Sequence, residues 1–136
     1  MIIKGYKLKD TPCIDEIVSL YKLTFGIALR NIGEAHDYPE ILYVLNGEAH
    51  MLVVGVPLSV QTGEMLMYAP NAYHIGAGKN TYADVLIVSF RSGSKKLKAH
   101  YNKVIKLDSK LQNEFIDVMD TAINSFVYEF SPNGKR

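Results

Sequence analysis

Short apolar runs separated by glycine, proline and asparagine residues fill the first two thirds of the chain. From Val18 to Phe90 the runs are rich in β-branched, aromatic and leucine residues, at intervals typical of a β-sandwich or barrel. The longest run, residues 81–90, contains four consecutive apolar residues from Val85 to Val88, which indicates a strand buried on both faces. The pattern therefore predicts a mainly β fold.

Two tight turns are expected inside this region. Asn46-Gly47 separates the apolar runs 41–45 and 48–54, and this dipeptide is a strong hairpin signal because both residues tolerate positive φ. Gly55-Val56 separates residues 51–54 from residues 58–60 in a similar way. We expect a hairpin at each of these two positions.

The pattern changes after residue 90. Residues 94–101 are typical of a short helical or irregular crossover, residues 104–107 of one more strand, and residues 109–127 of an amphipathic helix. Ser109 with Gln112 fits a capping box at the start of that helix. Its apolar stripe comprises Leu111, Phe115, Val118, Met119, Ala122, Ile123 and Phe126. This stripe either covers the chain's own barrel or pairs with a second copy.

Length and composition limit the class of protein. The 136 residues fit a single domain, which we place at residues 1–130, with residues 131–136 as a linker or terminal tail. Cys13 is the single cysteine, the N-terminus is too polar for a signal peptide, and no apolar stretch is long enough to span a membrane. We therefore expect a cytoplasmic protein. A net charge of +1 argues against nucleic-acid binding by this chain itself.

Polar residues stand immediately before the apolar run 41–45. Residues two apart on a strand share a face, so Glu34 and His36 should point the same way. A bulge caused by Pro39 would bring Glu40 to that face as well. These residues are interpreted as a metal site, a polar ligand pocket, or core polar groups that satisfy one another.

Two spacings in the sequence resemble the motifs of the cupin superfamily. The spacing Glu34-x-His36-x3-Glu40-x6-Gly47 is similar to G-x5-H-x-H-x3,4-E-x6-G, and the segment from Gly63 to His74 is similar to G-x5-P-x-G-x2-H-x3-N. The matching positions are His36, Glu40, Gly47, Gly63 and His74. The sequence departs from the first motif at Ala28, which replaces the opening glycine, and at Glu34, which replaces the first histidine. It departs from the second motif at Ala69, Asn71 and Gly78, which replace the proline, the glycine and the asparagine.

A longer stretch resembles one branch of that superfamily. The segments HDYPEILYVLNGEAHMLV, GEMLMYAPNAYHI and DVLIVSF, followed by a crossover and an amphipathic helix, are similar to the effector-binding and dimerisation domain of AraC-family bacterial transcription regulators. The resemblance covers about residues 15–127. It implies a cupin-like jelly-roll β-barrel followed by a C-terminal amphipathic α-helix. A DNA-binding domain normally follows in that family and is absent from this chain, so we expect the chain to be part of a longer regulator.

The resemblance also implies a site and partners. Glu34, His36, Tyr38, Glu40, His74 and Tyr82 are the expected pocket residues. The expected ligand is a small-molecule effector, with a sugar among the candidates, and no cofactor is required. His36, Glu40 and His74 are nonetheless of the ligand types that suit a divalent transition metal. Tyr38 and Tyr82 are equally explained as ordinary strand residues.

The expected function is effector sensing and homodimerisation within a transcription regulator, without catalysis. The helix residues expected to face a second copy are Leu111, Phe115, Val118, Met119 and Ala122. DNA would be bound through the domain that lies outside this chain. The alternative is a stand-alone cupin metalloenzyme, a dioxygenase or isomerase, that uses His36, Glu40 and His74 as metal ligands.

Overall fold

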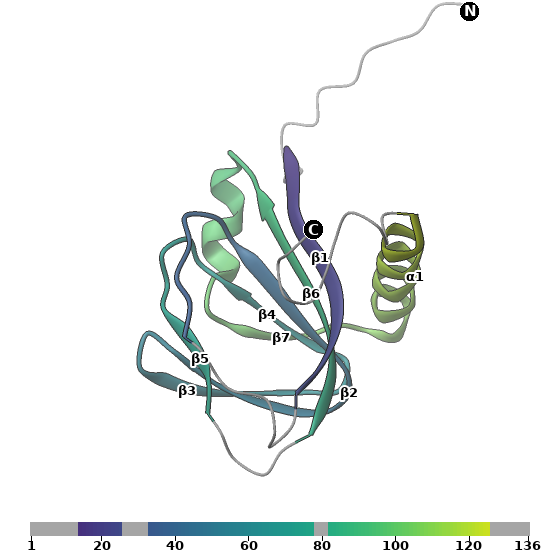
Figure 1. The fold of residues 1–136 in the computed structure, drawn as a ribbon, viewed down its shortest axis with the longest axis horizontal. Coiled ribbons are helices and arrows are strands. Elements are labelled where there is room, and N and C mark those ends of the chain that lie inside the picture. Colours follow the sequence, from purple (N-terminus) through teal and green to yellow (C-terminus); the bar gives the residue numbers. More distant parts are fainter. Residues whose placement is uncertain (1–13, 26–32, 78–81, 126–136) are drawn as a thin grey trace, which may run out of the picture.

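The structure is a computed structural model that describes residues 14–25, 33–77 and 82–125 (Figure 1). In chain order its elements are β1 (Glu16–Phe25), β2 (Glu40–Val53), β3 (Val56–Gln61), β4 (Glu64–Tyr68), β5 (His74–Gly76), β6 (Ala83–Arg91), the 3-10 helix η1 (Lys95–His100), β7 (Val104–Lys106) and α1 (Ser109–Ser125). The predictions of a mainly β fold and of a C-terminal helix are confirmed. No helix in the described part of the chain is long and apolar enough to cross a membrane.

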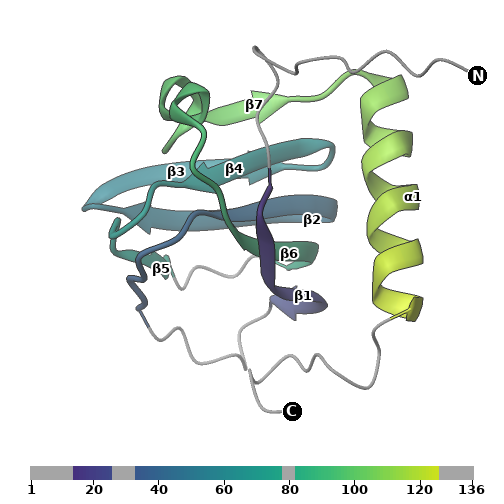
Figure 2. The same ribbon diagram turned by 90° about the horizontal axis from the view of Figure 1, so that it is seen from above.

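One long strand, β2, belongs to both sheets of the barrel. Its first half, up to Gly47, pairs with β6 and β4 in a sheet of order β1-β6-β2-β4-β7. Its second half, from Glu48, pairs with β3 on one side and β5 on the other. The two sheets therefore face each other, with β2 as the connection (Figures 1 and 2).

The predicted hairpin at Asn46-Gly47 is wrong. The pairing register of β2 with β6 shifts between Val44 and Asn46, and Gly47 has a φ of +92°. The bulge and the glycine bend β2 from one sheet into the other instead of reversing the chain. The second expected turn forms one residue earlier than predicted, at Val54-Gly55, where both residues have positive φ and Val53 pairs with Val56.

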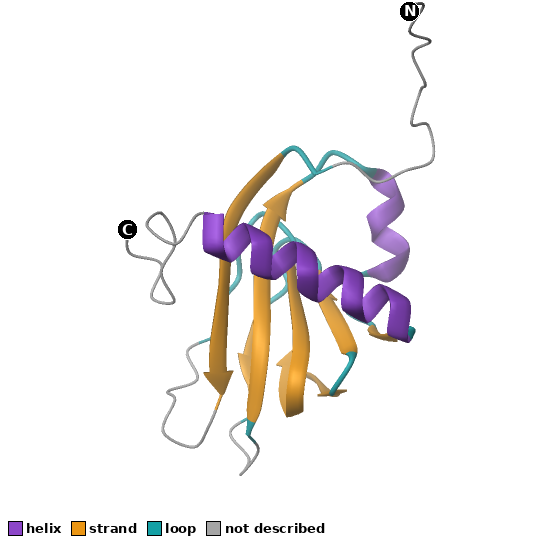
Figure 3. Ribbon diagram, turned by 90° about the vertical axis from the view of Figure 1, so that its right-hand side faces the viewer, coloured by secondary structure: helices purple, strands orange, loops and turns teal. Residues whose placement is uncertain are grey.

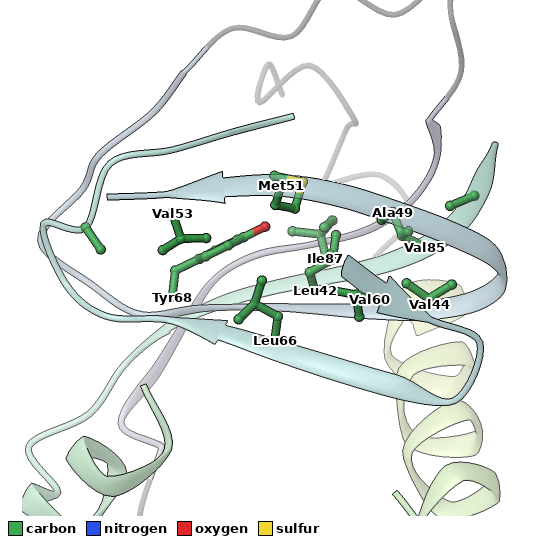
Figure 4. Packing of buried hydrophobic residues seen from close by; sticks show 12 residues of the cluster. Leu42, Val44, Ala49, Met51, Val53, Val60, Leu66, Tyr68, Val85 and Ile87 are labelled. Atoms are coloured by element: carbon green, nitrogen blue, oxygen red, sulfur yellow. The ribbon is translucent and has the colours of Figure 1, made fainter. Parts of the chain in front are cut away.

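Alternate residues of the strands fill the interior, which we call the lumen. Leu42 and Val44 of β2, Val85 and Ile87 of β6, and Leu66 and Tyr68 of β4 belong to this cluster. Figure 4 shows them interleaved with Met51, Val53 and Val60 from the facing sheet. The lumen is thus a packed apolar core over most of its depth.

Helix α1 covers the opposite, outer face of the first sheet (Figure 3). Met119 is 4% exposed and packs with Leu20, Tyr43, Leu86 and Val88. Phe115, Ala122 and Ile123 join the same cluster, and the Phe115 ring lies 5.0 Å from the Tyr43 ring, centroid to centroid. Four residues of the stripe, Phe115, Met119, Ala122 and Ile123, therefore pack on the chain's own barrel. Phe126 lies outside the described residues.

Two apolar residues of α1 do not take part in this packing. Leu111 is 48% exposed and Val118 is 66% exposed. The helix begins with Asp108 as its cap, because the Asp108 carboxylate accepts a hydrogen bond from the Leu111 N–H at 2.9 Å. The predicted capping box is therefore wrong: Gln112 donates its side-chain amide N–H to the carbonyl of Leu107 instead.

Candidate metal and ligand site

An irregular segment before β2 brings the predicted residues together. Glu34 forms an isolated bridge with His74, in which each backbone N–H donates to the other residue's carbonyl at 2.9 Å. The chain then bends at Asp37 and Tyr38 and enters β2 at Glu40. Glu34, His36 and Glu40 lie close together, as expected. The bridge and the bend bring them together, and not a common face of one strand.

Four side chains converge at this end of the lumen. Glu34, His36, Glu40 and His74 each offer a ligand atom, and these atoms all lie within 4.8 Å of one another. His36 Nε2 lies 3.6 Å from Glu40 Oε1, and His74 Nε2 lies 3.4 Å from Glu40 Oε2. Glu40 is 8% and His74 is 6% exposed, whereas Glu34 faces solvent. Glu34 is therefore the solvent-facing member of the cluster, and Glu40 and His74 are its buried members.

The backbone fixes which imidazole nitrogens point inward. His36 Nδ1 lies 2.8 Å from the Tyr38 carbonyl and His74 Nδ1 lies 3.0 Å from the Ala72 carbonyl. Since a carbonyl can only accept, both Nδ1 atoms carry protons and donate. The Nε2 atom of each histidine then faces the Glu40 carboxylate. Both Nε2 atoms are buried and have no hydrogen-bond partner in the described structure. Nitrogen lone pairs aimed at a carboxylate need a cation between them, either added protons or a metal ion.

Charge attraction in the cluster shifts two ionisation equilibria. Burial alone would raise the pKa of Glu40, but the neighbouring imidazoles of His36 and His74 outweigh it and lower that pKa below its usual value. Contact with the Glu40 carboxylate raises the pKa of His36, against the opposing effect of burial. Without a metal, the pair is therefore biased toward carboxylate and imidazolium.

A row of polar side chains crosses the sheet at the level of the cluster. Ser19, Ser89, Glu40 and Tyr68 stand in register on β1, β6, β2 and β4. By strand alternation all four face the lumen, because Leu42 and Ile87, two residues farther along, belong to the lumen cluster. Ser19 and Ser89 hydrogen-bond to each other through their hydroxyls. This end of the lumen is polar, and the rest is apolar.

Aromatic rings flank both imidazoles. Tyr38 stacks on His36 with 4.1 Å between ring centroids, so it lies beside the cluster. Tyr68 stacks on His74 at 3.9 Å, and its buried hydroxyl has no hydrogen-bond partner in the described structure. Sequence reasoning did not select Tyr68 for the pocket. Tyr68 lies opposite Glu40 because of the register between β4 and β2. The sequence alone does not reveal this register.

Tyr82 is not brought to the cluster. Its side chain is 60% exposed, and it borders an open hollow with Gly47, Glu48, Gln61 and Thr62. The carbonyl of Tyr82 accepts a hydrogen bond from the Glu48 N–H at 3.2 Å, which fixes Tyr82 at the bend of β2. Gly47, at that bend, comes seven residues after Glu40 in β2, so Tyr82 lies at the other end of this half-strand.

Comparisons with known proteins place the fold. No protein-family model matches the sequence, and no curated protein matches it. A cupin protein from Bacteroides fragilis superposes with a TM-score of 0.50 and 18% identity over 68% of this chain and 86% of that one. EutQ from Clostridium difficile gives a TM-score of 0.45 and 17% identity over 55% of this chain. An oxalate decarboxylase variant from Bacillus subtilis gives 0.42 and 18% identity over 67% of this chain.

The cupin jelly-roll prediction is confirmed by the Bacteroides fragilis protein together with the bent β2 and its two sheets. The match covers 57% of the EutQ chain and 27% of the oxalate decarboxylase chain, so this chain spans about half of the former and a quarter of the latter. Likeness at this level of identity establishes the fold and leaves function to the site itself.

The four converging residues fit a divalent transition metal. Two imidazole nitrogens and carboxylate oxygens are the donor types that iron, manganese, nickel and zinc accept. The hydrogen bonds from both Nδ1 atoms to backbone carbonyls are the outer contacts that usually orient a ligating histidine. The unpartnered Nε2 atoms are the groups that such an ion would engage.

Proposed function

We propose that this chain is the sensory and dimerisation domain of an AraC-type transcription regulator, and that a small-molecule effector binds at the cluster. The cluster carries the proposal, because its two buried Nε2 atoms have no partner in the described structure and converge on one buried carboxylate. The sequence resemblance over about residues 15–127 and the jelly-roll fold support the same assignment.

A bound metal is part of the proposal. His36, Glu40 and His74 would hold the ion, with Glu34 as the fourth donor. When bound, such an ion supplies an electrophilic centre for an oxygen atom of a ligand. The chain's own contribution is to hold both imidazoles by backbone carbonyls and to wall the site with tyrosine rings.

The exposed side of α1 is the proposed dimer contact. Leu111 and Val118 are seven residues apart, so they lie on one face of the helix, and both are exposed. Phe115, Met119 and Ala122 pack on the chain's own sheet. Of the five helix residues expected at the interface, Leu111 and Val118 are therefore those available to a symmetry-related copy.

In this proposal the effector biases the presentation of DNA-binding domains that lie outside this chain. A free-energy coupling of about 1–3 kcal/mol between effector binding and dimer geometry changes DNA affinity several-fold to hundredfold. The regulator would act in the cytoplasm, where its DNA is.

A metalloenzyme is the second candidate. The set of two imidazoles and one carboxylate favours it, because this set is also the facial arrangement of non-haem iron oxygenases. In that case His36, Glu40 and His74 are ligands, and Glu34 is a fourth ligand or a general base. Turnover of a substrate by metal-loaded protein would favour this candidate.

A fusion experiment tests the regulatory proposal. The chain is joined to a DNA-binding domain that represses a reporter gene only as a dimer. We expect repression by the fusion, and loss of repression in the double variant Leu111→Asp and Val118→Asp. The matched control, Asp117→Ala, changes another exposed position on the same helix and should repress normally.

Two further results decide the outcome. Repression that responds to an added compound should lose this response in His74→Ala. A folded, well-expressed fusion that does not repress would contradict the dimerisation role. Metal analysis of the purified chain should find about one transition-metal ion per chain, and less in His74→Ala.

A further inference from the structure

Glu34 stands where the cupin motif has its first histidine, and this difference changes the charge of the cluster. A set of three neutral imidazoles and one carboxylate carries a single negative charge. Glu34, His36, Glu40 and His74 together carry two, because each carboxylate contributes one and neutral imidazoles none. A divalent cation held by this set is therefore formally neutralised, whereas the three-histidine set leaves one positive charge.

The backbone ties Glu34 to the site. Its two hydrogen bonds with His74, both 2.9 Å long, fix the two residues side by side. Glu34 is the solvent-facing member of the cluster, whereas Glu40 and His74 are buried. The carboxylate of Glu34 is thus the solvent-facing charge of the cluster, and it acts on any ligand that approaches the ion from solvent.

The neighbouring cation does not restore a positive charge. The Arg91 guanidinium lies 5.1 Å from the centroid of the Tyr38 ring, on the wall of the site. It is already paired, with Arg91 Nη1 3.3 Å from Asp37 Oδ1 and Arg91 Nε 3.7 Å from Glu16 Oε2. Two carboxylates therefore offset its single charge.

We infer that Glu34 adapts this site to an uncharged ligand that binds through hydroxyl or carbonyl oxygens, and that it disfavours carboxylates and other anions. The inference rests on the proposed metal site. A neutralised ion still accepts an oxygen lone pair but no longer attracts an anion by net charge. The unpartnered hydroxyl of Tyr68, stacked on His74, is a further hydrogen-bonding group at the same end of the lumen.

Acetate and acetamide provide the test, because they have nearly the same shape and differ in charge. The protein is loaded with Co²⁺, and each probe is titrated while the visible absorption of the cobalt is followed. We expect the preference for acetate over acetamide to rise about tenfold in Glu34→Gln, because one negative charge near the ion is removed. Acetamide affinity should change little.

The control is Glu48→Gln, the same exchange at a glutamate whose contact is with His50, 3.6 Å away on the second half of β2. It should behave as the wild type does. If Glu34→Gln does not retain cobalt, Glu34→His removes the same charge while keeping a fourth donor and provides the comparison.

Failure of the inference differs from failure of the metal site. An equal preference for acetate in wild type and both Glu34 variants, with cobalt bound in each, overturns the role of Glu34 and leaves the metal site intact. Wild-type protein that binds no cobalt overturns both. A tenfold shift that appears equally in Glu48→Gln would assign the effect to overall charge and also overturn the inference.

Discussion

Tyr68→Phe should stabilise the protein in the absence of metal and ligand. The Tyr68 side chain is 1% exposed, and Figure 4 shows its ring lying across the lumen among apolar side chains. Its hydroxyl has no hydrogen-bond partner in the described structure. Burial, followed by the charge of Glu40, raises the pKa of Tyr68 well above its usual value, so the group remains an uncharged phenol. A buried hydroxyl without a partner loses its hydration and gains nothing in return.

The magnitude follows from that loss. An unsatisfied buried polar group costs about 1–3 kcal/mol, and removing a single oxygen leaves the rest of the ring in place. The free energy of unfolding should therefore rise by about 1–3 kcal/mol in Tyr68→Phe. For a domain of this size the melting temperature should rise by roughly 3–10 °C.

Urea denaturation followed by circular dichroism, in the presence of a chelator, measures the change. Tyr43→Phe is the matched control: it is equally buried, but on the outer face of β2, against Phe115. We expect a change of about 0.5 kcal/mol or less there. In metal-loaded protein with a bound effector the sign should reverse for Tyr68→Phe, because the hydroxyl then has a partner.

A loss of 1 kcal/mol or more in metal-free Tyr68→Phe would refute this reasoning. It would mean that the hydroxyl already has a structural partner and is not available to a ligand. An unchanged stability in both variants would assign no cost to the buried hydroxyl and would equally contradict the calculation.

Three other predictions concern different parts of the molecule. Met119→Ala should lower the free energy of unfolding by about 2–4 kcal/mol because it opens a cavity beneath α1, while Val118→Ala on the exposed face should change it by less than about 0.5 kcal/mol; urea denaturation compares them. Gly47→Ala should prevent or strongly impair folding, because the residue has a φ of +92° and an added Cβ would lie 2.0 Å from a backbone oxygen; circular dichroism and soluble yield report this. In metal-free protein the pairing of His36 with Glu40 should stabilise the fold fully between about pH 4.5 and 6.5. The lowered pKa of Glu40 makes this contribution disappear as the pH falls below that window, and the raised pKa of His36 makes it disappear as the pH rises above it; His36→Gln should flatten the profile of stability against pH.

The predictable part of the fold was the part governed by local pattern. The long apolar run at residues 81–90 became β6, a strand that is buried between the lumen and α1. The offsets of three and four identified α1 and its buried face around Met119. Both patterns arise because buried positions must be apolar. Their spacing along the sequence therefore follows the period of the helix or strand.

The bend of β2 could not be predicted in the same way. Asn46-Gly47 permits positive φ, but a hairpin and a strand bend both use that freedom. The choice depends on pairing with β6 and β4 before the glycine and with β3 and β5 after it, which are contacts far away in sequence. Tyr68 and Tyr82 show the same limit, since the register that places Tyr68 opposite Glu40 and Tyr82 beside Glu48 is not a local property.

The first half of β2 links the cluster to the proposed dimer helix through strand geometry alone. Glu40 and Leu42 face the lumen, whereas Ile41 and Tyr43 pack in the apolar core beneath α1. Neighbouring residues of β2 therefore point to opposite faces of the sheet. A ligand that displaces Glu40 must therefore move Ile41, and Tyr43 two residues later contacts Phe115 of the helix. Because both faces are packed, such a displacement is transmitted and not absorbed. The strand that carries the buried carboxylate is thus one physical route by which the proposed effector could change how α1 meets a second copy.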